Sequence, residues 1–123
     1  MESILGNTRR ADIAFYASGR IDITAHVARH LQLQKGDVLD ICTDGREYYL
    51  YVRHRVPTVG RHEAAVYPTN RNGNNFRAWS QKLCKAVINV SGSKDDKAVR
   101  LCVGEAVQNQ DRILLPIIIK HLL

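Results

Sequence analysis

The stretch GRIDITAHVARHLQLQKGDVLDI (residues 19–41) changes its hydrophobic periodicity twice, and this change decides the expected fold. Ile21 and Ile23 alternate with polar residues, which is typical of a half-buried strand. Val27 and Leu31 then lie four residues apart, the spacing of one helix face. The last four residues, VLDI, resume alternation, so the stretch predicts a strand, a short helix and a second strand.

Two residues mark the ends of the helix predicted over residues 25–33. Thr24 precedes it, and its hydroxyl can accept a hydrogen bond from a free first-turn N–H, so we expect Thr24 to be the N-cap. Gly36 follows the helix and can adopt a positive φ, which predicts the chain reversal before the next strand.

The flanking segments extend the strand pattern on both sides. ADIAFYAS (residues 11–18) alternates apolar and small residues, and it predicts a strand. Asp44-Gly45 separates two alternating segments, which is a strong signal for a hairpin turn, and the return strand covers residues 48–53.

The second half of the chain predicts a loop, a helix and another hairpin. Residues 54–75 are rich in Pro, Gly and Asn and indicate a long loop or linker, with a short strand at 64–67. Residues 76–90 are predicted to form an amphipathic helix, with Asn75 as its N-cap and Gly92 as its stop. Its apolar stripe comprises Phe76, Trp79, Leu83, Val87 and Val90.

The predicted C-terminal hairpin pairs an alternating segment (residues 99–103) with the apolar run of residues 113–119 around a QNQD turn. Pro116 lacks a backbone N–H, so this strand is expected at a sheet edge or with a bulge. The sequence shows no convincing internal repeat.

Composition limits the classes of protein that this chain can represent. Its 123 residues suffice for one ordinary domain or two very small ones. No apolar run reaches the roughly 20 residues of a membrane span, and the N-terminus has no apolar core of signal-peptide length. Three cysteines without CxxC spacing argue against a disulfide framework or a zinc site. We therefore expect a cytoplasmic protein without membrane contact.

The formal net charge is +6, and its excess is unevenly distributed. Residues 57–123 hold ten of the 18 Lys and Arg residues but only five of the twelve Asp and Glu residues. This asymmetry suggests a polyanionic partner, although modest positive charge is also common in proteins that bind none.

Residues 12–55 resemble the AbrB/MazE-type swapped-hairpin family of bacterial transition-state regulators and antitoxins. The family pattern runs G-R-hydrophobic-x-I-P, a short helix ending L-G-L, then x-x-G-D before alternating hydrophobic residues. Matching positions here are Gly19, Arg20, Ile21, Ile23, Leu31, Leu33, Gly36 and Asp37. Thr24 replaces the usual proline, Gln32 the usual glycine, and Ala25 and Ala28 the early basic positions of the helix.

The resemblance implies a β-rich α+β fold in which residues 1–56 form an AbrB-like half-barrel. Residues 57–75 would be a loop or linker, and residues 76–123 a helix plus β-hairpin extension that stands apart or packs with the first part as one domain. In the family, two such units interleave into an obligate homodimer. A unit of about 45 residues buries too small a core alone, so we expect a homodimer here, unless the second half covers the open face within one chain.

Five basic residues are the candidate nucleic-acid contacts. The resemblance points to Arg20 and Arg29, whose guanidinium groups suit phosphates and base edges. The basic window of residues 61–85 adds Arg77, Lys82 and Lys85, which fall opposite the apolar stripe on a helical wheel. The alternative for the two arginines is an ordinary solvated or salt-bridged surface, with Asp22 and Asp40 available as partners, and for the other three residues a solvated outer face. The aromatic residues of this window lie on the apolar side, so we interpret them as core.

Other site chemistry has little support in the sequence. His26 and His30 are four apart on a predicted helix, but no third metal ligand accompanies them, so we predict no metal site. Cys84 and Cys102 fall inside predicted elements, where cysteine behaves as a small hydrophobic residue. No nucleophile elbow or glycine-rich phosphate loop is present. We therefore expect a non-enzymatic protein without a cofactor.

Two functions follow from these features. The leading hypothesis is a dimeric, DNA-binding transcriptional regulator that contacts phosphates and bases through arginines. The alternative is a protein-interaction module, antitoxin-like, that keeps the barrel without binding DNA. In that case the apolar segment LLPIIIKHLL (residues 114–123) would add a strand to the sheet of a protein partner.

Overall fold

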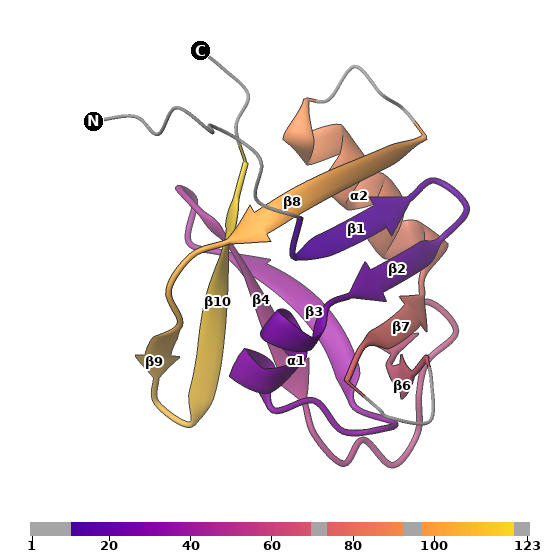
Figure 1. The fold of residues 1–123 in the computed structure, drawn as a ribbon, viewed down its shortest axis with the longest axis vertical. Coiled ribbons are helices and arrows are strands. Elements are labelled where there is room, and N and C mark those ends of the chain that lie inside the picture. Colours follow the sequence, from indigo (N-terminus) through magenta and orange to yellow (C-terminus); the bar gives the residue numbers. More distant parts are fainter. Residues whose placement is uncertain (1–10, 70–73, 93–96, 120–123) are drawn as a thin grey trace.

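The computed structural model describes residues 11–69, 74–92 and 97–119, which form a strand-rich α+β fold (Figure 1). Antiparallel strands make up one sheet, and two helices pack against it. The elements are β1 (Ile13–Tyr16), β2 (Arg20–Ile23), α1 (Ala25–Leu31), β3 (Val38–Thr43), β4 (Tyr48–Arg53), β5 (Ala64–Ala65), β6 (Tyr67–Pro68), β7 (Phe76–Trp79), α2 (Gln81–Ser91), β8 (Ala98–Val103), β9 (Val107–Asn109) and β10 (Arg112–Ile118). The expected β-rich α+β class is confirmed.

The sheet curls into a nearly closed barrel because the two ends of its strand order are adjacent in the chain. The order is β5-β3-β4-β10-β8-β1-β2-β7-β6, and β9 pairs with β10. Val66 alone separates β5 from β6, and its side chain is buried. Its N–H donates to the carbonyl of Asp37 and its carbonyl accepts from the N–H of Gly36, both at 2.8 Å. One short segment therefore belongs to both ends of the sheet.

The two halves of the chain follow the same path. The first half runs β1, β2, α1, β3 and β4, and the second runs β5/β6, β7, α2, β8 and β10. Corresponding strands meet as antiparallel pairs, β2 with β7 and β4 with β10. The structure thus contains an internal repeat of path, which sequence inspection missed.

Because the two halves interleave, strands of the second half cover the core of the first half within the same chain. Strand β1 pairs with β8 and β4 pairs with β10, so both halves line one core. Phe15, Ile21, Leu50 and Leu115 are all fully buried. The small core of the first half therefore no longer requires a second copy. The homodimer expected from the sequence stays a prediction.

The hairpin between β3 and β4 has the predicted turn. Six residue pairs align the strands, from Val38 opposite Arg53 to Thr43 opposite Tyr48. The Asp44 carboxylate accepts from the backbone N–H groups of Arg46 and Glu47, each at 2.9 Å. These bonds are those of an Asx turn, in which the aspartate side chain replaces backbone acceptors.

The helix predicted over residues 76–90 is wrong at its start. Residues Phe76–Trp79 form β7, because four backbone pairs with β2 hold them extended. Helix α2 begins only at Gln81, and Ser80 is its N-cap, with the hydroxyl accepting from the N–H of Leu83 at 3.2 Å. The stop at Gly92 is confirmed, since this residue has a φ of +66°.

The ends of α1 are made differently from the prediction. Thr24 occupies the N-cap position, but its hydroxyl donates to the carbonyl of Asp12 at 2.8 Å. The side chain of Asn75 instead accepts from the N–H of Ala25 at 2.9 Å. Asn75 was the expected cap of the second helix, so a residue from the second half caps the helix of the first. The helix ends at Leu31, before Gln32 with a φ of +55°.

Strand β10 is central, with β4 on one side and β8 and β9 on the other. The edge position expected for this strand is therefore wrong. Between the pairs Ile117–Val103 and Leu114–Val107, two residues of β10 face the three residues that connect β8 to β9. The carbonyl of Pro116 accepts from the N–H of Gly104 in this connection at 2.8 Å. The missing N–H of proline therefore faces the irregular stretch, where the ladder does not need it.

Candidate nucleic-acid interface

One outer surface of the barrel gathers arginine and aromatic side chains from five neighbouring strands, β8, β1, β2, β7 and β6. Alternation turns Ile21 and Ala78 into the core, where both are fully buried, and turns their neighbours outward. The pairing aligns Arg100, Ala14, Asp22, Arg77 and Tyr67 in one row across these strands. We call this surface the arginine–aromatic face, and its residues are Tyr16, Arg20, Asp22, Tyr67, Arg77, Trp79 and Arg100.

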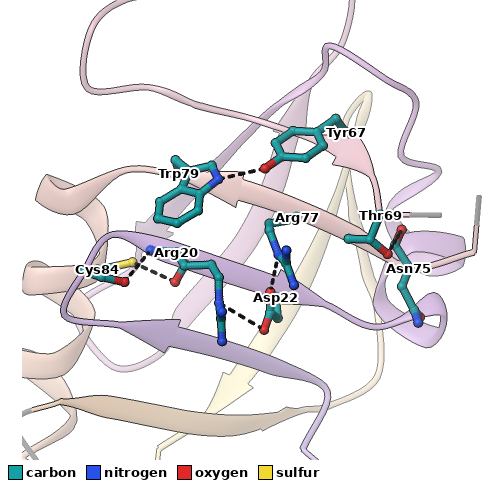
Figure 2. A network of polar contacts seen from close by, with 9 residues as sticks. Arg20, Asp22, Tyr67, Thr69, Asn75, Arg77, Trp79 and Cys84 are labelled. Atoms are coloured by element: carbon teal, nitrogen blue, oxygen red, sulfur yellow. Dashed lines mark hydrogen bonds and ion pairs between the residues drawn. The ribbon is translucent and has the colours of Figure 1, made fainter.

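A single carboxylate holds two of the arginines (Figure 2). The Nε atom of Arg77 lies 2.8 Å from Oδ1 of Asp22, and the Nε atom of Arg20 lies 3.4 Å from Oδ2. About a third of each of these side chains is exposed, so solvent screens both ion pairs and they contribute little to stability. Two guanidinium groups sharing one carboxylate leave uncompensated positive charge at the surface.

The ring of Tyr16 lies under the guanidinium groups of Arg20 and Arg100. The guanidinium carbon of Arg20 lies 4.2 Å from the centroid of the Tyr16 ring, and that of Arg100 lies 5.5 Å from it. Both distances are those of cation–π contacts. The side-chain hydrogen bond with Tyr16 and the charge of Asp22 raise the pKa of Arg20, so it is charged at every physiological pH. The face thus carries three arginines against one aspartate.

Trp79 and Tyr67 lie beside the arginines, and they correct the interpretation of the aromatic residues as core. Trp79 is 50% exposed and Tyr67 is 38% exposed, whereas Phe76 is buried. The indole Nε1–H donates to the Tyr67 hydroxyl at 2.7 Å, which holds both rings in place (Figure 2). The reason is the period of β7: in a strand, residues 76 and 79 face opposite sides.

The structure separates the five predicted contact residues. Arg20 and Arg77 come together around Asp22. Because Arg77 belongs to strand β7, it does not share a helix face with Lys82 and Lys85, which are exposed on α2. Arg29 is exposed in the last turn of α1.

Lys82 lines a different hollow, of about 320 Å³, together with Asp40, Arg53 and Glu63. It therefore shares its surroundings with residues of β3 and β4, outside the arginine–aromatic face. Sequence reasoning missed Arg100 and Tyr16 as members of the face, whereas it named Asp22 as an available salt-bridge partner of the arginines. The alternation of Val99 and Leu101 around Arg100 was the available signal for its outward position.

An open groove of about 600 Å³ continues the face past β1 toward the start of α1. Tyr16, Asp22, His26, Asn75 and Arg100 are among its lining residues. Tyr16, Asp22 and Arg100 also belong to the arginine–aromatic face, so the groove and the face form one continuous surface.

The opposite side of the barrel has similar residue types but a different charge. Arg112 lies over the ring of Tyr51, 4.9 Å from its centroid, and the Tyr51 hydroxyl donates to Asp40 at 3.1 Å. Arg53 forms an ion pair with Glu63. The hydroxyl of Tyr49 bonds the carboxylates of Glu47 and Asp44, and this raises the pKa of Tyr49 to about 12. Arg53 has Glu63 as its carboxylate, whereas Arg20 and Arg77 share Asp22, so this side offers a comparison for the arginine–aromatic face.

Groups suited to catalysis are few in the part of the chain that the structure describes. Burial raises the pKa of the Cys84 thiol to about 11, which makes it a poor nucleophile at neutral pH. The imidazole Nδ1 of His54 lies 2.7 Å from the buried carboxylate of Asp37. The rings of His26 and His30 pack edge to face, 4.6 Å apart.

No group of three or more His, Cys, Asp or Glu side chains among residues 11–69, 74–92 and 97–119 is placed to hold a metal ion. Over the same ranges, no helix has the length and apolarity needed to cross a membrane.

Comparison with known proteins assigns no family to the chain: no family model, no curated protein and no solved structure matches it.

Proposed function

We propose that this protein is a non-enzymatic nucleic-acid-binding protein that contacts DNA through the arginine–aromatic face. The observation that carries the proposal is the convergence of Arg20, Arg77 and Arg100 on one surface with a single carboxylate between them. Guanidinium groups bind phosphate oxygens with two parallel hydrogen bonds, which makes such a cluster suited to a nucleic-acid backbone. A role in transcription regulation accords with the AbrB/MazE-type resemblance of residues 12–55.

The proposal fixes the expected salt dependence. If each of the three arginines meets one phosphate, the logarithm of the binding constant falls with the logarithm of salt concentration at a slope of about −2 to −3. Between 50 mM and 200 mM salt, the affinity should then fall about 16- to 64-fold. Arg29, Lys82 and Lys85 would add attraction at a distance, which is screened beyond about 10 Å at 0.1 M salt.

Fluorescence anisotropy with labelled DNA of mixed sequence, at two salt concentrations, tests the proposal. The test variant is Arg20→Ala/Arg77→Ala, which removes two phosphate contacts and should lower the salt slope by about 2. The control is Arg53→Ala/Arg112→Ala, which removes the same charge from the neighbouring strands β4 and β10 on the opposite side. Equal losses in both variants would show a general charge effect. Absence of binding at low salt would refute the proposal.

The pairing of β10 removes one reason for the alternative function, a protein-interaction module. The segment of residues 114–123 was expected to add a strand to the sheet of a partner. Its residues 114–118 belong to β10, which is already paired with β4 on one side and with β8 and β9 on the other, while residues 120–123 lie outside the described residues. The described part of this segment therefore lies inside the sheet of this chain, and no second function is proposed.

The homodimer is also proposed, and it is independent of the nucleic-acid surface. Light scattering distinguishes a monomer of 13.9 kDa from a particle of twice that mass. A monomer would show that the barrel completed within one chain removes the need for a second copy.

A further inference from the structure

We infer that the arginine–aromatic face binds unpaired nucleic acid in preference to a duplex; this inference rests on the proposed function and names the form of its ligand. The shape of the surface is the first argument. The major groove of DNA is about 12 Å wide and admits a helix or a two-stranded ribbon. The face spans five adjacent strands at about 4.8 Å spacing, hence about 19 Å in width, and cannot enter that groove.

The exposed aromatic residues are the second argument. Trp79 is half exposed, and its hydrogen bond with Tyr67 fixes the indole before any ligand arrives. A base can stack on a fixed aromatic ring only when its own π-face is free, and within a duplex both faces are occupied by neighbouring base pairs. Trp79 and Tyr67 therefore add affinity for an unpaired strand and little for a duplex.

The arrangement of the arginines is the third argument. Arg20 lies opposite Trp79 in the strand register, and its guanidinium lies over the Tyr16 ring. A guanidinium donates to phosphate oxygens and can also stack on a base. A phosphate contact at Arg20 and a base contact at Trp79 can therefore be made side by side, as an extended single strand requires.

The charge of the face supports the same conclusion. Three arginines and Asp22 leave a net charge of +2, which is small for a surface that would hold a duplex by its phosphates alone. Stacking supplies affinity that salt does not screen. We therefore expect the single strand to retain more of its affinity at high salt than the duplex does.

Intrinsic fluorescence tests the inference directly, because Trp79 is the one tryptophan of the sequence. The probes are a 12-nucleotide oligo-dT and a DNA duplex of 12 base pairs, each titrated into the full chain at 50 mM salt. We expect the oligo-dT to quench the tryptophan emission and to bind at least tenfold more tightly than the duplex. Equal affinities without quenching would overturn the inference and leave the proposed function standing. No binding of either probe would overturn both.

Two substitutions assign the effect to the indole. Trp79→Ala should weaken oligo-dT binding about 5- to 150-fold, measured by anisotropy, and should change duplex binding little. Trp79→Phe keeps an aromatic ring and should restore most of the affinity, which shows that the loss comes from stacking. Tyr51→Ala, on the opposite side of the barrel, is the control and should bind as the unaltered protein does. Unchanged oligo-dT binding by a folded Trp79→Ala variant, judged by circular dichroism, would refute the stacking role.

Discussion

Gly19, which joins β1 to β2, allows the sharpest test of how the two halves pack together. Its φ is +104°, and a Cβ added there would lie 3.1 Å from the backbone nitrogen and 3.2 Å from the Cα of Gln81. Its carbonyl accepts from the N–H of Ser80 at 2.8 Å, so the turn lies directly against the start of α2. The substitution Gly19→Ala therefore perturbs the contact between the first hairpin and the second helix.

Gly36 provides the matched control for the magnitude. Its φ is +90°, but a Cβ there would meet no atom within 4 Å. A positive φ costs a residue with a Cβ about 1–2 kcal/mol, and the lower entropy of the unfolded chain returns about 0.4–1 kcal/mol. Gly36→Ala should therefore lose about 1 kcal/mol. Gly19→Ala adds the forced shift of backbone atoms, typically about 1–3 kcal/mol, for a total of about 2–4 kcal/mol.

Urea denaturation followed by circular dichroism measures both variants. We expect the midpoint of Gly19→Ala to lie well below that of Gly36→Ala, with similar slopes m. Equal midpoints would show that the close approach of Gly19 to Gln81 costs nothing, and the reverse order would refute the reasoning outright.

Three further outcomes follow from the core and the helix cap. Asn75→Ala should lower stability by about 0.5–2 kcal/mol through loss of the cap on α1, while Asn74→Ala, at an exposed neighbour, should change it little; urea midpoints decide between them. Leu115→Ala, at a fully buried position, should cost about 2–5 kcal/mol, and the exposed Ile118 should tolerate the same change with a much smaller shift in the melting temperature. Burial raises the pKa of the Cys84 thiol from 9.0 to about 11, so the folded protein binds this proton more tightly than the unfolded chain does. The contribution of this proton to the unfolding free energy is complete below pH 9 and is lost as the pH rises through 11. Cys84→Ala should therefore flatten the dependence of the unfolding free energy on pH between 9 and 11, and an unchanged profile would contradict the assignment.

The predictable part of the fold consists of elements whose signal is local. The hairpin at Asp44-Gly45, the helix around Val27 and the stop at Gly92 were all recognisable from neighbouring residues, and the structure confirms them. Residues 76–79 were assigned to the wrong element, because Phe76 and Trp79 fit a helix stripe and nothing local shows that β2 will pair with them.

The candidate site was predictable only in part for the same reason. Arg20 and Arg77 were identified from a motif and from local charge, but their shared partner Asp22 depends on the pairing of β2 with β7. Arg100 joins them because β8 pairs with β1 across more than 80 residues of chain.

By itself, the sequence determined the class of the protein: short strands, two amphipathic helices and a basic surplus concentrated in the second half. These properties follow from periodicity and composition, which act over a few neighbouring residues. Tertiary structure alone decided that the two halves interleave into one barrel and that Trp79 faces outward beside the arginines. Strand pairing joins residues far apart in the chain, and its register sets which side chains share a face, so local pattern cannot foresee it.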